Sequence, residues 1–181
     1  MFSDITLDPA VVSIFGLAAA ILGVAALPTA RRRVVETTIR RLLARWVDTP
    51  TSEPIEESTI REAVHDHIDP SDVRIVTADG SYYATDRDGV ESLARIGDAL
   101  DWLPYRPDRF DCEEYAELLV AIAAFVGGVN ACGVVYDWSG GHAYNVVVTT
   151  DGEAIFVESQ TGEIVTVGEG SYALDDATII F

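Results

Sequence analysis

The sequence predicts an α+β fold preceded by an N-terminal hydrophobic helix. Three observations support this class: an uncharged apolar stretch near the start, helical periodicity in the middle, and alternating apolar residues between glycine-containing turns in the last third. Because the helices come first and the strands follow as an antiparallel meander, the arrangement is typical of α+β proteins. The 181 residues are enough for one ordinary domain with its own core and an appendage.

The apolar stretch at residues 10–27 contains no charged residue. As a helix it would be about 27 Å long, which is just enough to cross the hydrocarbon core of a bilayer. Residues 31–33 are all arginine, whereas Asp4 and Asp8 precede the stretch. This charge pattern favours a membrane anchor with a cytoplasmic-facing C-terminal domain over a cleaved signal peptide. A helix buried in a homo-oligomer or a viral particle is the remaining alternative.

Three regions are predicted along the chain. Residues 1–47 contain the transmembrane helix and then a basic amphipathic helix. Residues 48–56 carry two prolines and no apolar periodicity, so they are interpreted as a linker. Residues 57–181 form the globular domain.

Within the globular domain, helices are predicted from apolar spacings of three and four residues, and strands from alternation bounded by turn residues. The expected helices cover residues 57–68, 89–103 and 111–126. The expected strands cover residues 73–77, 81–85, 131–138, 142–149, 154–158, 163–167 and 177–181.

The charge balance excludes some partners. The chain has 30 acidic and 12 basic residues, all of the latter arginine, for a net charge of −18. Such a domain repels nucleic-acid phosphates, so we expect no nucleic-acid partner. The apolar content is too high for a disordered acidic tail, and an acidic surface on a folded protein is typical of a halophilic archaeon or its virus.

Cys112 is the candidate nucleophile. Asp111 and Glu114 form a capping-box pattern that places the cysteine in the first turn of a helix. The helix dipole and the free backbone N–H groups at such a terminus favour the thiolate, which is the reactive form.

His142 and Glu158 are the candidate partners of that thiol. His142 follows the turn Gly140-Gly141 at the start of a strand, where an imidazole could act as base and acid. Glu158 lies at a strand end in hairpin register with it and would fix the imidazole tautomer. Asn145 is the second choice for this role, although strand alternation turns it to the other face.

The remaining cysteine and histidines are predicted to be structural. Cys132 lies in an apolar run and is expected in the core; a bridge to Cys112 is the competing hypothesis. His65 and His67 are expected to be exposed. No Cys/His spacing of zinc-site type is present, so no metal site is predicted.

Three blocks, "FDCEEYAELLV", "GGHAYNVVV" and "FVESQTGEI", resemble the papain-like and transglutaminase-like cysteine hydrolases. The greatest similarity is to the catalytic domain related to the Marasmius oreades agglutinin, a group also found in phage proteins. The resemblance implies that Cys112 is the nucleophile, His142 the base and Glu158 the orienting acid. It departs from papain-type enzymes because the chain's only glutamine, Gln160, lies far downstream of the cysteine. We expect no cofactor; calcium stays open because the agglutinin's protease depends on it, although no calcium loop is recognisable.

The predicted function is therefore a membrane-anchored papain-like cysteine hydrolase, a protease or an acyl transferase, acting on a protein or peptide substrate. The alternative is a non-catalytic structural protein of a virion or membrane that retains a cysteine-protease-like fold. Reactivity of the Cys112 thiol separates the two, whereas membrane association does not.

Overall fold

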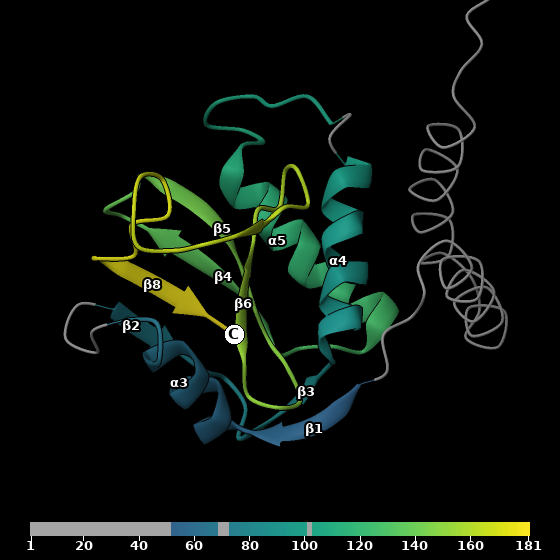
Figure 1. The fold of residues 1–181 in the computed structure, drawn as a ribbon. Helices are drawn as coiled ribbons and strands as arrows, with labels where there is room; N and C mark the ends of the chain where they lie inside the picture. Colours follow the sequence, from purple (N-terminus) through teal and green to yellow (C-terminus); the bar gives the residue numbers. More distant parts are fainter. Residues whose placement is uncertain (1–51, 69–72, 101–102) are drawn as a thin grey trace, which may run out of the picture. The chain divides into compact units, whose positions relative to one another are not determined.

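The computed structural model describes residues 52–68, 73–100 and 103–181 (Figure 1). These residues belong to one compact unit, which spans residues 47–181. The two predicted N-terminal helices, in residues 1–47, lie outside the described residues, and the proposed division at residues 47 and 56 stays a prediction. Across the described ranges, no helix is long and apolar enough to cross a bilayer. The predicted membrane-anchored, cytoplasmic-facing localisation thus has no support in the described residues and is corrected to that extent.

Within the described residues, three α-helices form where apolar periodicity predicted them. They are α3 (Glu57–His65), α4 (Arg87–Leu100) and α5 (Cys112–Ile122), and α5 continues as a π-helical turn, η1 (Ala123–Gly127). Gly128 ends this segment in the left-handed conformation, with φ of 67°, which glycine adopts without steric cost. The predicted helix at residues 111–126 is thus confirmed as one continuous helical segment.

The main sheet has six strands in the order β2-β8-β4-β5-β6-β7. Neighbouring strands are antiparallel except β2 and β8, which are parallel. The predicted sheet was purely antiparallel, and this mixed pairing corrects it. The strands are β2 (Val73–Val76), β4 (Cys132–Asp137), β5 (His142–Val148), β6 (Ala154–Val157), β7 (Ile164–Val165) and β8 (Ala177–Ile180).

A second, two-stranded sheet lies near the start of the described unit. β1 (Glu53–Glu56) pairs antiparallel with β3 (Ser81–Ala84). Four residues of the predicted linker therefore form a strand. β2 and β3 flank the turn at Asp79-Gly80 but belong to different sheets, because each has found a partner distant in sequence.

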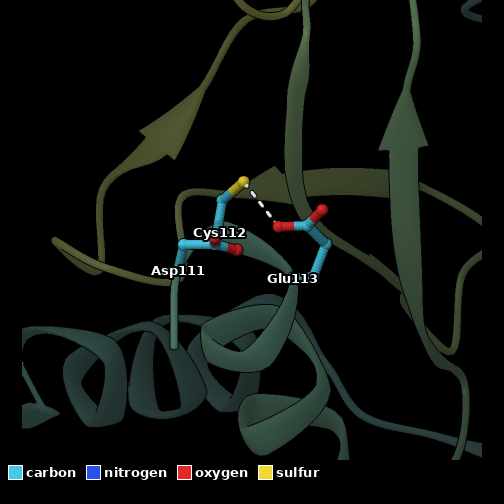
Figure 2. Close-up of side chains that lie close together, drawn as sticks. All are labelled: Asp111, Cys112 and Glu113. Atoms are coloured by element: carbon cyan, nitrogen blue, oxygen red, sulfur yellow. Dashed lines mark hydrogen bonds between the residues drawn. The ribbon is translucent and has the colours of Figure 1, made fainter. Parts of the chain in front are cut away.

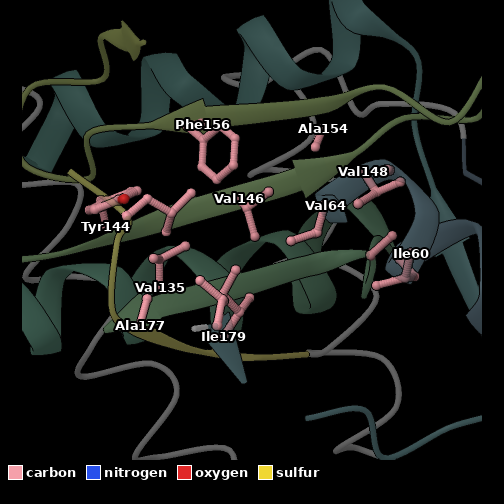
Figure 3. Close-up of a cluster of buried hydrophobic side chains, with 14 of the residues drawn as sticks. Ile60, Val64, Val135, Tyr144, Val146, Val148, Ala154, Phe156, Ala177 and Ile179 are labelled. Atoms are coloured by element: carbon pink, nitrogen blue, oxygen red, sulfur yellow. The ribbon is translucent and has the colours of Figure 1, made fainter. Parts of the chain in front are cut away.

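The two faces of β5 bury separate cores. Tyr144, Val146 and Val148 point into the cluster that also holds Ile60 and Val64 of α3 (Figure 3). Val147 contributes to the other cluster, in which α4 and α5 pack against the opposite face. Full burial of one such aliphatic side chain stabilises the fold by roughly 1.5–3 kcal/mol. Both faces of the strand that begins at His142 are thus fixed by packing.

Candidate functional site

Cys112 is the first residue of α5, and the helix is anchored at both its start and its middle. The capping box between Asp111 and Glu114 is present, with the Asp111 N–H donating to Glu114 Oε2 at 2.8 Å. Leu119 is completely buried, and the side chain of Asn145 donates from Nδ2 to the Ala116 carbonyl at 3.0 Å. The thiol therefore stands at the end of a rigidly held helix.

The thiol of Cys112 lies 3.1 Å from Glu113 Oε2 (Figure 2). Burial raises the pKa of Cys112 to about 11, and the hydrogen bond to Glu113 adds to this effect, whereas the backbone N–H of Ala143 acts in the opposite direction. The expectation that the helix terminus favours the thiolate is wrong for this conformation. Desolvation and the neighbouring carboxylates favour the neutral thiol.

His142 and Glu158 form a close pair. Nε2 of His142 lies 2.6 Å from Glu158 Oε2. His142 is the first residue of β5, and Glu158 directly follows β6, the strand that pairs with β5. Since Nε2 is engaged with the carboxylate, Nδ1 is the nitrogen left for a proton from another group.

Glu158 is held by two further donors. The Tyr172 hydroxyl donates to Oε2 at 2.8 Å and the Gln160 N–H donates to Oε1 at 2.9 Å. Burial of Glu158 acts to raise its pKa, but the hydrogen bonds from His142, Gln160 and Tyr172 outweigh burial, and the net direction is downward. The carboxylate therefore stays ionised at neutral pH.

The three predicted site residues are brought into one region. The amide of Ala143, which directly follows His142, faces the sulfur of Cys112. The side-chain hydrogen bond of that sulfur goes to Glu113, however, while the imidazole is bound to Glu158. The roles of Cys112, His142 and Glu158 stay a prediction.

Asn145, the second choice for orienting the imidazole, serves a different purpose. It is completely buried on the α5 side of the sheet, bonds the carbonyls of Ala116 and Gly133, and accepts a hydrogen bond from Ser159. It therefore ties α5 to the sheet, and these hydrogen bonds go to residues other than His142.

Sequence reasoning missed Asp137 and Tyr172. Asp137 is 1% exposed, and its carboxylate accepts hydrogen bonds from Ser139 Oγ and from the amides of Gly140 and Leu174. An aspartate just before a Gly-Gly turn is a recognisable local signal for such bonding. Tyr172 had no local signal, because its partner Glu158 lies 14 residues away.

The other cysteine and histidines largely follow their predicted roles. Cys132 is buried, and both cysteines are free, so the competing bridge is not formed. His67 is exposed as predicted, whereas His65 is half-buried, and its Nδ1 has no hydrogen-bond partner among the described residues.

Asp111, Cys112 and Glu113 offer ligand atoms within 4.8 Å of one another. Calcium takes about six to eight oxygen ligands, whereas this group supplies two carboxylates and a thiol, which is a soft ligand. Asp111 Oδ2 also already accepts the Asp108 N–H at 2.6 Å. The group therefore fits calcium poorly.

No protein-family model and no curated protein matches this chain. Among solved structures, the PSL1a–E64 complex matches with a TM-score of 0.55 and 23% identity, over 71% of this chain and 51% of that chain. A structure of the Polyporus squamosus lectin bound to the human-type influenza-binding epitope Neu5Aca2-6Galb1-4GlcNAc matches with a TM-score of 0.53 and 23% identity, over 71% and 49%. The chain thus spans about half the length of these solved chains, and at this identity the likeness concerns the fold.

These neighbours correct the predicted family. Both structures are of the Polyporus squamosus lectin, PSL1a, and this finding overturns the assignment to the papain-like/transglutaminase-like cysteine hydrolases and to the fold class named after them. The predicted enzyme, a membrane-anchored protease or acyl transferase with a protein or peptide substrate, is overturned with it. The alternative of a virion or membrane structural protein gains no support from lectin neighbours either. What the comparisons give for this chain is a fold shared with part of a lectin chain.

Proposed function

We propose that the described domain captures an electrophilic ligand through the thiol of Cys112, with His142 as the proton acceptor and Glu158 as its orienting partner. The observation that carries the proposal is the 2.6 Å contact between His142 Nε2 and Glu158 Oε2. His142 directly precedes Ala143, whose amide faces the sulfur of Cys112. A thiol, an imidazole and an ionised carboxylate in this order form the usual arrangement for activating a sulfur nucleophile. The proposal ends at the covalent adduct and includes no turnover.

The chemistry of capture follows from which imidazole nitrogen is free. Nδ1 of His142 takes the proton of the Cys112 thiol, and the imidazolium that forms is stabilised by Glu158. With an epoxide such as E64, which is named in the PSL1a complex, the sulfur attacks a ring carbon and the carbon–oxygen bond breaks. The released alkoxide takes the proton from His142. The products are a thioether and a hydroxyl group, so atoms and charges balance.

Capture requires the thiol to leave Glu113. In the described conformation the thiol donates a hydrogen bond to Glu113 Oε2, and this hydrogen bond keeps the proton on the sulfur. The side chain of Cys112 is only partly buried, so rotation about its Cα–Cβ bond is available without unpacking the core. The reaction is therefore expected to be slow at neutral pH and faster as the pH rises.

The test is the mass of the intact protein after incubation with E64. The background is Cys132→Ser, which leaves Cys112 as the only cysteine. We expect a single adduct that is absent in Cys112→Ser and that forms roughly 100-fold more slowly in His142→Ala, the usual contribution of a general base. Tyr83→Phe, a change to an exposed side chain on β3, is the control and should react at the parent rate. No adduct, or equal rates with and without His142, would overturn the proposal.

Glycan binding is a second candidate, favoured by an aromatic pair whose tryptophan is exposed. Trp138 is 63% exposed and stacks on Tyr136, with ring centroids 6.1 Å apart and planes at 15°. Such an exposed flat apolar face offers a surface for the apolar side of a sugar ring. The Polyporus squamosus lectin is described with a sialylated trisaccharide, but the net charge of −18 disfavours an anionic sugar here. A neutral glycan fits this chain better.

Titration calorimetry tests this candidate. We expect Galb1-4GlcNAc to bind more tightly than Neu5Aca2-6Galb1-4GlcNAc, and the binding to disappear in Trp138→Ala. Ile164→Ala, which shortens another exposed apolar side chain, serves as the control. Absence of heat for both glycans, or binding unaffected by loss of Trp138, would exclude this site.

A further inference from the structure

Tyr172 contacts both members of the His142–Glu158 pair. Its hydroxyl donates to Glu158 Oε2 at 2.8 Å, the same oxygen that bonds His142 Nε2. Its ring meets the imidazole edge-on, with centroids 5.6 Å apart and planes at 68°. One side chain thus touches the carboxylate through its polar end and the imidazole through its ring.

We propose that Tyr172 is a positioning residue, which fixes the Glu158 carboxylate and the His142 ring in the orientation that leaves Nδ1 free for the Cys112 thiol. This inference rests on the proposed function. With the Gln160 amide on Oε1 and two donors on Oε2, the carboxylate has no freedom to rotate. A carboxylate held in this way holds the imidazole that bonds it.

The segment that carries Tyr172 is itself fixed to the hairpin that carries His142. Asp137 pairs with His142 across β4 and β5, and its buried carboxylate accepts the amides of Gly140 and Leu174, each at 2.8 Å. Any Cβ at Gly140 would overlap the carbonyl of Ser171, the residue before Tyr172. This close backbone approach is available only to glycine, and it sets the position of the tyrosine.

The hydroxyl of Tyr172 is suited to permanent donation. Burial, followed by the hydrogen bond to the Glu158 carboxylate, raises the pKa of Tyr172 above its ordinary value. The proton therefore remains on the phenol throughout the pH range in which a thiol is usually studied. Tyr172 acts by holding Glu158 and takes no part in proton transfer.

The test compares Tyr172→Phe with Tyr144→Phe, both in the Cys132→Ser background, by the rate of E64 adduct formation between pH 4 and 9. Tyr144 belongs to the same aromatic cluster, but its hydroxyl bonds Asp137 and not Glu158. Loss of a hydrogen bond to a charged group is expected to slow Tyr172→Phe roughly 10-fold at pH 7. Without the hydroxyl the pKa of Glu158 should be higher, so the pH at which the rate falls on the acid side should move upward by about one unit. Tyr144→Phe should react within about twofold of the parent rate.

A double variant separates positioning from a general loss of structure. Adding Tyr172→Phe to Glu158→Gln should cause almost no further slowing, because the carboxylate that the hydroxyl holds is already gone. If the adduct forms in a His142-dependent manner but Tyr172→Phe behaves as the parent, or slows the Glu158→Gln variant by the same factor, the role of Tyr172 is refuted and the proposed function stands. If no variant forms an adduct, the proposed function fails, and this inference fails with it.

Discussion

Removing the charge of Glu113 should activate Cys112. The sulfur lies 3.1 Å from Glu113 Oε2, and this carboxylate disfavours the thiolate both as a hydrogen-bond acceptor and as a like charge. Glu113→Gln keeps the size of the side chain but removes the charge. We therefore expect the variant to have a lower Cys112 pKa and a faster reaction with a small alkylating agent.

The magnitude follows from the thiolate fraction. With a pKa of about 11, roughly one thiol in a thousand is ionised at pH 8, whereas a free thiol of pKa about 8.5 would be about one-quarter ionised. Burial is the largest cause of the raised value and persists in the variant, so only part of this difference is recovered. Lowering the pKa by about one unit would make alkylation about tenfold faster at pH 8.

The assay is the rate of iodoacetamide labelling against pH in the Cys132→Ser background. Glu117→Gln is the matched control, because Glu117 lies on the same helix and bonds the Tyr136 hydroxyl at 3.1 Å instead of the thiol. It should label at close to the parent rate. If Glu113→Gln labels no faster than Glu117→Gln, the carboxylate does not hold the thiol in its neutral form and the reasoning is refuted.

Three further predictions concern stability. Gly140→Ala forces a Cβ against the Ser171 carbonyl and should lower the free energy of unfolding by about 1–3 kcal/mol in a urea titration, whereas Gly80→Ala, with nothing within 4 Å, should change it little. Asn145→Ala removes the side-chain donor from two buried carbonyls and should cost about 2–4 kcal/mol in the same titration; a loss below about 1 kcal/mol would show that water replaces the amide. Because the folded-state pKa of Glu158 is lowered, its contribution is present above the ordinary glutamate pKa of about 4.3 and is lost as the pH falls through the folded value. The parent should therefore lose more stability between pH 6 and pH 3 than Glu158→Gln does, and equal losses would contradict the direction of this pKa.

Local signals in the sequence were sufficient for most of the described elements. The capping box at Asp111 and Glu114 predicted the start of α5, and the apolar alternation predicted β4, β5 and β6. Each of these signals acts within a few residues of chain or across one hairpin. The parallel pairing of β2 with β8 was missed because it joins segments about a hundred residues apart, and no turn residue encodes such a contact.

The candidate site was only partly predictable for the same reason. The approach of His142 to Glu158 follows from the pairing of β5 with β6, which the intervening turn makes foreseeable. The raised pKa of Cys112 depends on burial and on the rotamer of Glu113, and neither can be obtained from spacing. Tyr172 reaches Glu158 from an irregular segment held by Asp137, so its role required the tertiary structure. The family assignment rested on three short blocks of sequence. Similarity in such blocks did not predict which solved structures share the fold.

The central claim is that Glu158 binds Nε2 of His142 and leaves Nδ1 free. The nitrogen-15 chemical shifts of the His142 ring measure this directly, with His142→Ala used to assign its signals among the three histidines. Above the pH at which the ring loses its charge, the account predicts a proton on Nε2 and an unprotonated Nδ1 in the parent, and a mixture of the two tautomers in Glu158→Gln. A neutral ring with its proton on Nδ1 in the parent would contradict the account, because Nδ1 would then have no lone pair to accept the proton of the Cys112 thiol.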